Sequence, residues 1–260
     1  MKRREPAVAG TFYPGSPERL REQVEGFLAD VPATGPAPKA IIGPHAGTVY
    51  SGPIAASAYG RLREARARIG RVVLLGPSHR VPLRGLGVCG AELYATPLGD
   101  IALDREGTEK LLALPQVRLA DHAHAREHSL ELHLPFLQVV LPRFTLLPLV
   151  VGDAAPAEIA AALALVWGGA ETLVVVSTDL CHYLDYETAC RLDRETAGFI
   201  EQLEWERIED QRACGHFPLC GLLAHARALG LRVETVDLRN SGDTAGDKGQ
   251  VVGYGAFLLS

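Results

Sequence analysis

The stretch RVVLLGPSHR, residues 71–80, decides the fold prediction for this chain. Its apolar run, Val72–Leu75, shows no alternation of apolar and polar residues, and such strands are typically covered on both faces, as in parallel or mixed sheets. Gly76 and Pro77 then turn the chain, and His79 follows. The stretch therefore predicts a buried strand that delivers a histidine just beyond its end.

Two other stretches repeat this arrangement. In AIIGPHAGTVYSG, residues 40–52, a short apolar segment runs into Gly-Pro and His45. In TLVVVSTDLCHY, residues 172–183, an apolar run is followed by Asp179 and His182. Because ligands in open α/β sheets sit beyond the carboxyl ends of the strands, the three histidines are expected to converge at one edge of the sheet.

Apolar runs alternate with helical patterns along most of the chain, which predicts an α/β fold with a central mixed, mostly parallel sheet and helices on both faces. The expected strands are Ile41–Ile42 with its flanks, Val72–Leu75, Leu146–Val151, Leu173–Val176 and the two closing segments 231–242 and 250–260. The expected helices are Ile54–Arg68, Arg105–Leu114, His128–Val140, Pro156–Trp167, Tyr186–Glu209 and Pro218–Leu229. The glycine-rich stretch 83–104 is expected to form an antiparallel hairpin at the sheet edge.

The chain is expected to form one domain over residues 1–260. Its most linker-like stretch, ADVPATGPAPKA at 29–40, lies only a few residues before the first apolar run. Residues 1–38 are therefore interpreted as an N-terminal arm and helix that pack on this domain.

Composition narrows the class of protein. The chain has 260 residues, is 47% hydrophobic and carries a net charge of -5, without a basic stripe that would indicate nucleic acid. Its apolar runs are far shorter than the ~20 residues of a membrane span, and the N-terminus lacks the apolar core of a signal peptide. Five scattered cysteines without a CxxC pair indicate reduced thiols and a cytoplasmic protein.

Three neutral imidazoles, or two with a carboxylate, suit a divalent transition metal. Asp179 lies three residues before His182 and could ligate the metal, orient a ligand or act as a base. Alternatively, each histidine could simply bond loop carbonyls and fix a turn. The equivalent placement of His45, His79 and His182 after three strands favours one shared site.

A second polar cluster is DHAHAREHSLELHLPF, residues 121–136, whose spacing is not HExxH and does not fit a zinc protease. One interpretation is an amphipathic helix, capped by Glu127 or Ser129, whose polar residues face solvent. The other places Glu127 or His128 at the mouth of a pocket, where either would contact substrate or metal-bound water.

Two further segments carry reactive side chains. ACGHFPLCGLL, residues 213–223, offers Cys214 and His216 before a helix, where a thiolate is favoured, but no orienting acid is evident. RNSGDTAGDKGQ, residues 239–250, carries Asp243, Thr244 and Asp247 in a loop between the last two strands, which could close the site.

Seven ordered motifs, spread over nearly the whole chain, make the sequence similar to the Memo family, whose bacterial and archaeal members are also called AmmeMemoRadiSam system protein B. The motifs are AVAGTFYPGS, GPHAGTVYSG, LLGPSHR, REHSLELHLPFL, STDLCHY, CGHFPL and SGDTAGDKGQVVGYGAF. The resemblance implies a fold similar to class III, LigB-type extradiol dioxygenases. Those enzymes hold non-haem iron with two histidines and a glutamate, and use a further histidine as acid and base.

Carried over by motif, His45 and His79 match the two metal-ligand histidines, and His182 matches the third pocket histidine. The glutamate ligand corresponds to a cysteine in animal Memo proteins. The resemblance implies that this cysteine is absent here, with Thr244 beside Asp243 at about its place. The third ligand would then be His182 or Asp243, and the harder site would favour iron(II), manganese or zinc over copper(I).

Two functions from different classes follow from these residues. The first is a non-haem metal-dependent oxidoreductase with iron, or alternatively copper or zinc, in which His182 or Asp179 moves protons and Tyr50 lines the pocket. The second is a non-catalytic metal-binding partner of other proteins of its gene system. An enzyme needs open metal positions for an unknown small-molecule substrate, whereas a closed four-ligand site implies structure or storage. A zinc hydrolase is a weaker third interpretation.

Overall fold

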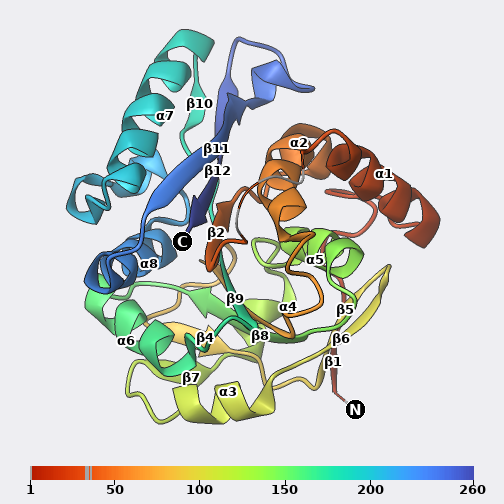
Figure 1. Ribbon diagram of the computed structural model, residues 1–260, viewed down its shortest axis with the longest axis vertical. Helices are drawn as coiled ribbons and strands as arrows, with labels where there is room; N and C mark the ends of the chain where they lie inside the picture. Colours follow the sequence, from red (N-terminus) through yellow and green to blue (C-terminus); the bar gives the residue numbers. More distant parts are fainter. Residues whose placement is uncertain (1, 33–34, 36) are drawn as a thin grey trace.

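A large mixed sheet organises the protein. The computed structural model describes residues 2–32, 35 and 37–260. Within them the strands follow the order β10-β12-β2-β9-β3-β8-β4-β7, and β11 also pairs with β12 (Figure 1). The strands are β2 (Ala40–Gly43), β3 (Arg71–Pro77), β4 (Leu86–Val88), β7 (Val117–Leu119), β8 (Thr145–Val151), β9 (Thr172–Ser177), β10 (His182–Leu184), β11 (Val233–Asn240) and β12 (Val251–Leu259).

The four central strands, β2, β9, β3 and β8, are all parallel to one another. Antiparallel pairing joins β12 to β2, β10 and β11 on one side, and β4 to β8 on the other. The mixed α/β fold is therefore confirmed, with the parallel part concentrated in the centre, beside the outer parallel pair β4 and β7. This centre places the ends of three histidine-bearing segments side by side.

Helices cover both faces of the main sheet. Strand β3 lies between the two faces, which explains its continuous run of apolar residues. Val72 and Leu74 pack into one core, whereas Val73 and Leu75 pack into the other. The first core is covered by α1 (Pro17–Ala29), α2 (Thr48–Tyr59) and α5 (Leu134–Val140), and the second by α3 (Arg105–Leu111), α6 (Pro156–Val166) and α8 (His216–Leu229). Helix α7 (Tyr186–Glu201) packs against β11 and β12.

Several predicted elements differ in extent. Helix α7 stops at Glu201 rather than Glu209, because Leu203 adopts a left-handed conformation with φ of 57°. The helix expected from His128 begins only at Leu134, after the 3-10 turn Glu131–His133. The stretch 83–104 is divided as well. Strand β4 joins the main sheet, while β5 (Leu93–Thr96) and β6 (Gly99–Ala102) form a hairpin that pairs with β1 (Arg3–Arg4) in a separate sheet.

The N-terminal arm is fastened to the domain by a buried carboxylate. Glu131 is fully buried and accepts hydrogen bonds from the backbone N–H groups of Ala7 (2.8 Å) and Val8 (3.1 Å) and from the hydroxyl of Tyr13 (2.5 Å). The guanidinium of Arg4 completes the set as a buried ion pair with Glu131. Arg4 also donates to the carbonyl oxygens of His124 and Glu127, so the arm is joined to the whole polar cluster.

Helix α1 continues from this arm and packs against α2 and α5 through a buried apolar stripe. Residues 33, 34 and 36 of the linker-like stretch, like Met1 of the arm, lie outside the described residues. Among the helices that the structure describes, none has both the length and the apolar character needed to cross a bilayer.

Candidate metal centre

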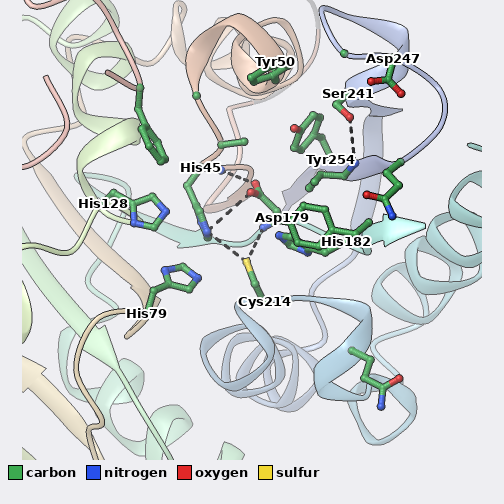
Figure 2. Close-up of a pocket in the computed structure, with 18 of the residues that line it drawn as sticks. His45, Tyr50, His79, His128, Asp179, His182, Cys214, Ser241, Asp247 and Tyr254 are labelled. Carbon is green, nitrogen blue, oxygen red and sulfur yellow. Dashed lines mark hydrogen bonds and ion pairs between the residues drawn. The ribbon is translucent and has the colours of Figure 1, made fainter. Parts of the chain in front are cut away.

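Three adjacent parallel strands deliver the predicted histidines to one cavity. His45 follows β2, His79 follows β3, and Asp179 and His182 follow β9, which lies between the other two strands. All four residues line a cavity of about 830 Å³. Figure 2 shows the side chains of His45, His79, Asp179 and His182 gathered around Cys214. The predicted convergence at one sheet edge is what the structure contains.

His45 is buried, and its hydrogen bonds determine which ring nitrogen is protonated. Its Nδ1 lies 2.6 Å from the hydroxyl of Ser177, and that hydroxyl donates its only proton to the carbonyl oxygen of Ser129 at 2.6 Å. Ser177 must therefore accept from His45, so Nδ1 carries the proton. Burial lowers the pKa of His45 well below its usual value. The ring is consequently neutral, and its unprotonated Nε2 carries the lone pair that a metal would use.

Glu127 fixes His79 in the same way. Its carboxylate accepts from the backbone N–H of His79 at 2.6 Å and lies 3.0 Å from His79 Nδ1. It also accepts the backbone N–H groups of His128 and Ser129, both at 2.9 Å. Burial alone would raise the pKa of Glu127, but the bonds from His128 and His79 hold it well below its usual value. His79 Nδ1 is therefore the donor, and Nε2 is free.

This arrangement corrects the interpretation of the 121–136 cluster. Glu127 is fully buried behind the histidines rather than at the mouth of the pocket, and it is not among the residues that line the cavity. His128 does line the cavity, stacked on His79 at 4.9 Å between ring centroids and covered by the edge of Phe12 at 5.0 Å. The alternative of a solvent-facing polar helix face does not fit, because Glu127, Ser129 and Glu131 are all buried.

Cys214, which is distant in sequence from the histidines, also lies in this group. Its Sγ lies 3.3 Å from His45 Nε2 and 3.3 Å from the backbone N of Asp179. The turn that carries it packs so closely on β9 that a Cβ on Gly215 would come within 2.4 Å of the Ser177 carbonyl oxygen, so only glycine fits there. Burial and the nearby carboxylate of Asp179 raise the pKa of the Cys214 thiol.

The potential ligand atoms of His45, His79 and Cys214 all lie within 4.8 Å of one another. Asp179, His182 and Cys214 form a second such group, and His79, Glu127 and His128 a third. A first-row metal with ligands at about 2.0–2.3 Å needs these atoms only slightly closer together. The donors fit such an ion, because both histidines present a free Nε2 and the sulfur lies beside them. Among the groups found in the described chain, none unites all three predicted histidines.

His182 and Asp179 lie on the other side of the sulfur. His182 Nδ1 lies 2.9 Å from the Leu180 carbonyl oxygen, to which it donates, and this leaves Nε2 free. Asp179 accepts the backbone N–H of His45 at 2.7 Å, and burial raises the pKa of its carboxyl. Both residues can therefore hold or move a proton beside the candidate metal group.

The 239–250 loop closes one side of the cavity, as expected, but its two candidate ligands lie outside the lining. Asp243 does not line the cavity. Its carboxylate accepts from the Tyr186 hydroxyl at 2.6 Å and from the Asn240 backbone N–H at 3.0 Å. Thr244 is outside the lining as well and donates to the Ser241 carbonyl oxygen at 3.2 Å. The site was expected to lack a cysteine. A thiol is nevertheless present at the cavity, that of Cys214 in the motif CGHFPL.

The cavity is lined by further residues, some of which the sequence predicted and some of which it did not. Tyr50, in the motif that contains His45, lines the cavity as predicted for the pocket, and so does Asp247. His216, noted beside Cys214 in the sequence, does not line it, and the histidine in contact with Cys214 is His45. Tyr183 and Tyr254 also line the cavity, and nothing local in the sequence marks them. Ser177 lies behind the lining, where it accepts from His45, and its only signal in the sequence is its position at the end of an apolar run.

A family profile described as Memo-like protein matches residues 4–258. The chain belongs to the Memo family. Its relatives include two MEMO1 family proteins. That of Aquifex aeolicus is 36% identical over 98% of each chain, and that of Sulfolobus acidocaldarius is 35% identical over 96% of each chain. A third, from Methanopyrus kandleri, is 35% identical over 98% of both chains. The seven motifs found in the sequence thus reflect similarity along essentially the whole Memo-family chain.

A solved structure supports the fold of this family member. The crystal structure of an uncharacterized protein from Escherichia coli K12 matches with a TM-score of 0.56. The match covers 84% of this chain and 98% of that chain, at 16% sequence identity. At this identity the similarity establishes the shared α/β fold.

Proposed function

We propose that this Memo-family protein is a non-haem metal-dependent oxidoreductase whose metal is held by His45, His79 and Cys214. One observation carries the proposal: two imidazole nitrogens with free lone pairs and one sulfur cluster at the wall of a cavity of about 830 Å³. A metal held by these three residues would keep positions for other ligands, as catalytic sites require. The cavity is also large enough for a small-molecule substrate.

Iron(II) is proposed first, with copper and zinc as alternatives. Two histidines and a carboxylate with open positions are the arrangement used by non-haem iron(II) oxygenases. The proposed site shares the two histidines, and its third ligand would be a thiol in place of the carboxylate. Sulfur makes the site softer than one built on Asp243 or Thr244, so copper(I) is no longer disfavoured. When bound, iron or copper would supply a redox-active Lewis acid that activates oxygen or the substrate, whereas zinc would supply a Lewis acid alone.

The chain's own residues would position the reactants and move protons. Glu127 and Ser177 hold the ligand histidines in the tautomers that leave Nε2 free. His182, with its free Nε2 facing the cavity, and the buried Asp179 are proposed to exchange a proton with the substrate. Burial favours the protonated form of Asp179, which suits a proton donor.

A non-catalytic metal-binding role, in partnership with proteins of the AmmeMemoRadiSam system, is the alternative. It predicts a metal whose positions are all filled by the protein, for example by His182 in addition to the three ligands. All five cysteines are free, which suits a protein that works in a reducing cytoplasm.

Metal analysis of protein purified without chelator tests the proposal. His45→Ala, His79→Ala and Cys214→Ser should each lose most of the bound metal, whereas His122→Ala, which changes an exposed histidine outside the cavity, should keep it. His182→Ala should retain metal but lose metal-dependent oxygen consumption. Normal metal content in all three ligand variants would overturn the site. If the bound metal cannot take up a small added ligand, all its positions are filled, and the non-catalytic role is favoured.

A further inference from the structure

Tyr183 has an unusual backbone conformation next to the metal group. Its φ is 59°, in the left-handed region that costs a residue with a side chain roughly 1–2 kcal/mol. The register of β10 against β12 shifts at this point, from His182 opposite Val252 to Leu184 opposite Val251. Tyr183 is thus the extra residue of a β-bulge, a device that re-aims side chains beside functional sites.

The bulge has a geometric consequence. In a regular strand successive side chains point to opposite faces, so His182 and its neighbour could not both face the cavity. Here both residues line it, with ring centroids 5.7 Å apart. The strained turn therefore presents a histidine and a phenol ring to the same space.

The rest of the fold does not explain this conformation. Tyr183 is 70% exposed, and within the described part of the chain its hydroxyl has no hydrogen-bond partner. A largely exposed aromatic ring that touches the edge of His182 and has an unbonded hydroxyl contributes little to stability. Backbone strain that no contact within the protein offsets is characteristic of residues that contact a ligand.

We propose that Tyr183 and Tyr50 form an aromatic subsite that binds a flat ring carried by the ligand of the metal. Tyr50 lies in the first turn of α2, close after His45, lines the same cavity and is 39% exposed. The substrate is accordingly a small molecule with a planar ring attached to a group that reaches the metal. This inference rests on the proposed metal site.

Two probes with the same metal-binding group separate the ring from the metal contact. Acetohydroxamic acid and benzohydroxamic acid differ by a methyl and a phenyl group on one hydroxamate. Their affinities are to be measured calorimetrically on zinc-loaded protein, because zinc is redox-silent. The wild type should bind the phenyl compound about threefold to tenfold more tightly. Tyr183→Gly should remove this preference and leave acetohydroxamate binding within about twofold, whereas Tyr183→Phe should keep the preference.

Leu203 supplies a matched control, because it is the other non-glycine residue with positive φ in the described chain and does not line the cavity. Leu203→Gly should leave the phenyl preference intact. Glycine adopts this conformation freely and Tyr183 is mostly exposed, so Tyr183→Gly should keep the wild-type Tm or raise it. Leu203→Gly also removes a leucine that packs against the second core, so its Tm should fall. A Tm lowered by more than about 4 °C in Tyr183→Gly would show that the conformation serves the fold and would overturn the proposal.

The possible failures are distinguishable. If acetohydroxamate binds the zinc-loaded wild type but the phenyl compound has no advantage, or if Tyr183→Gly keeps that advantage, the aromatic subsite is wrong and the metal site stands. If the protein takes up no zinc, or neither probe binds, the proposed open metal site itself fails, and the subsite fails with it.

Discussion

Glu127 and Glu131 lie four residues apart, are both fully buried, and do different work. Glu131 accepts four donors from the N-terminal arm and ties that arm to the domain. Glu127 accepts from His79 and from the backbone of its own segment, directly behind the cavity. The comparison teaches that burial and saturation with hydrogen bonds do not distinguish a structural carboxylate from a functional one; the partners do.

The largest effect expected from this comparison is on stability. Glu131→Gln leaves the buried guanidinium of Arg4 without its counter-ion, and breaking such a pair typically costs about 3–5 kcal/mol. Chemical denaturation of the metal-free protein should show this loss. Glu22→Gln, an exposed change on α1, is the control. Metal affinity of the folded Glu131→Gln protein should change by less than about threefold, and a larger loss would show that the two carboxylates are not separable.

Glu127→Gln should show the opposite profile. An amide is a weaker acceptor for His79 Nδ1, so the histidine is held less firmly with Nε2 toward the cavity. Loss of such an outer partner typically weakens metal binding about 10–100-fold. Titration with zinc against a competing chelator measures this change. If Glu127→Gln binds zinc as tightly as the wild type, Glu127 does not support metal binding through His79.

The dependence of stability on pH should separate the contribution of the buried histidines from that of Glu127. Burial lowers the pKa of His124 to about 4 and that of His133 to about 3. Between pH 6.5 and these values the unfolded chain binds more protons than the folded protein, so stability falls as the pH falls. Each histidine contributes up to about 1.4 kcal/mol per pH unit.

The pKa of Glu127 is depressed, so its contribution is present above pH 4.5 and is lost only as the pH falls below that value. Denaturation curves from pH 7 to pH 3 measure both parts. His133→Gln should flatten the slope below pH 6.5, and Glu127→Gln should flatten only the part below pH 4.5. A wild-type stability independent of pH between 6.5 and 5 would contradict the neutral buried histidines.

The smallest effect is expected from Tyr13→Phe. It removes one of the four donors to Glu131 while keeping the ring, which should cost about 1 kcal/mol of stability. Metal affinity should be unchanged, because Tyr13 neither lines the cavity nor contacts the ligand histidines. A measurable change in zinc affinity would show that the arm adjusts the metal site through Glu131.

The sequence predicted those parts of the site that local patterns encode. The run Val72–Leu75 indicated a strand covered on both faces, and β3 is such a strand between two cores. Because His45, His79 and His182 follow strands, their convergence followed from the general geometry of parallel sheets. These inferences need only the periodicity of a segment and the residue at its end.

The remaining parts depend on contacts between distant segments. Nothing near Cys214 indicates that it lies against His45, because this proximity results from the close packing of Gly215 on β9. The polar residues Glu127 and Glu131 resemble a solvent-facing helix in sequence, and their burial is explained only by the arm and by His79. Asp243 illustrates the reverse case, since a plausible ligand is occupied by a tyrosine hydroxyl.

The close packing of the Cys214 turn on β9 also sets the order of events during synthesis. His45 and Cys214 are 169 residues apart in the chain, so they meet only after most of the protein has left the ribosome and the central sheet has formed. A nascent chain has no assembled site to offer, so the proposed metal would not serve as the nucleus of folding. Under the proposed function the ion would be loaded late, by a folded protein that takes it from the surrounding pool or from a donor.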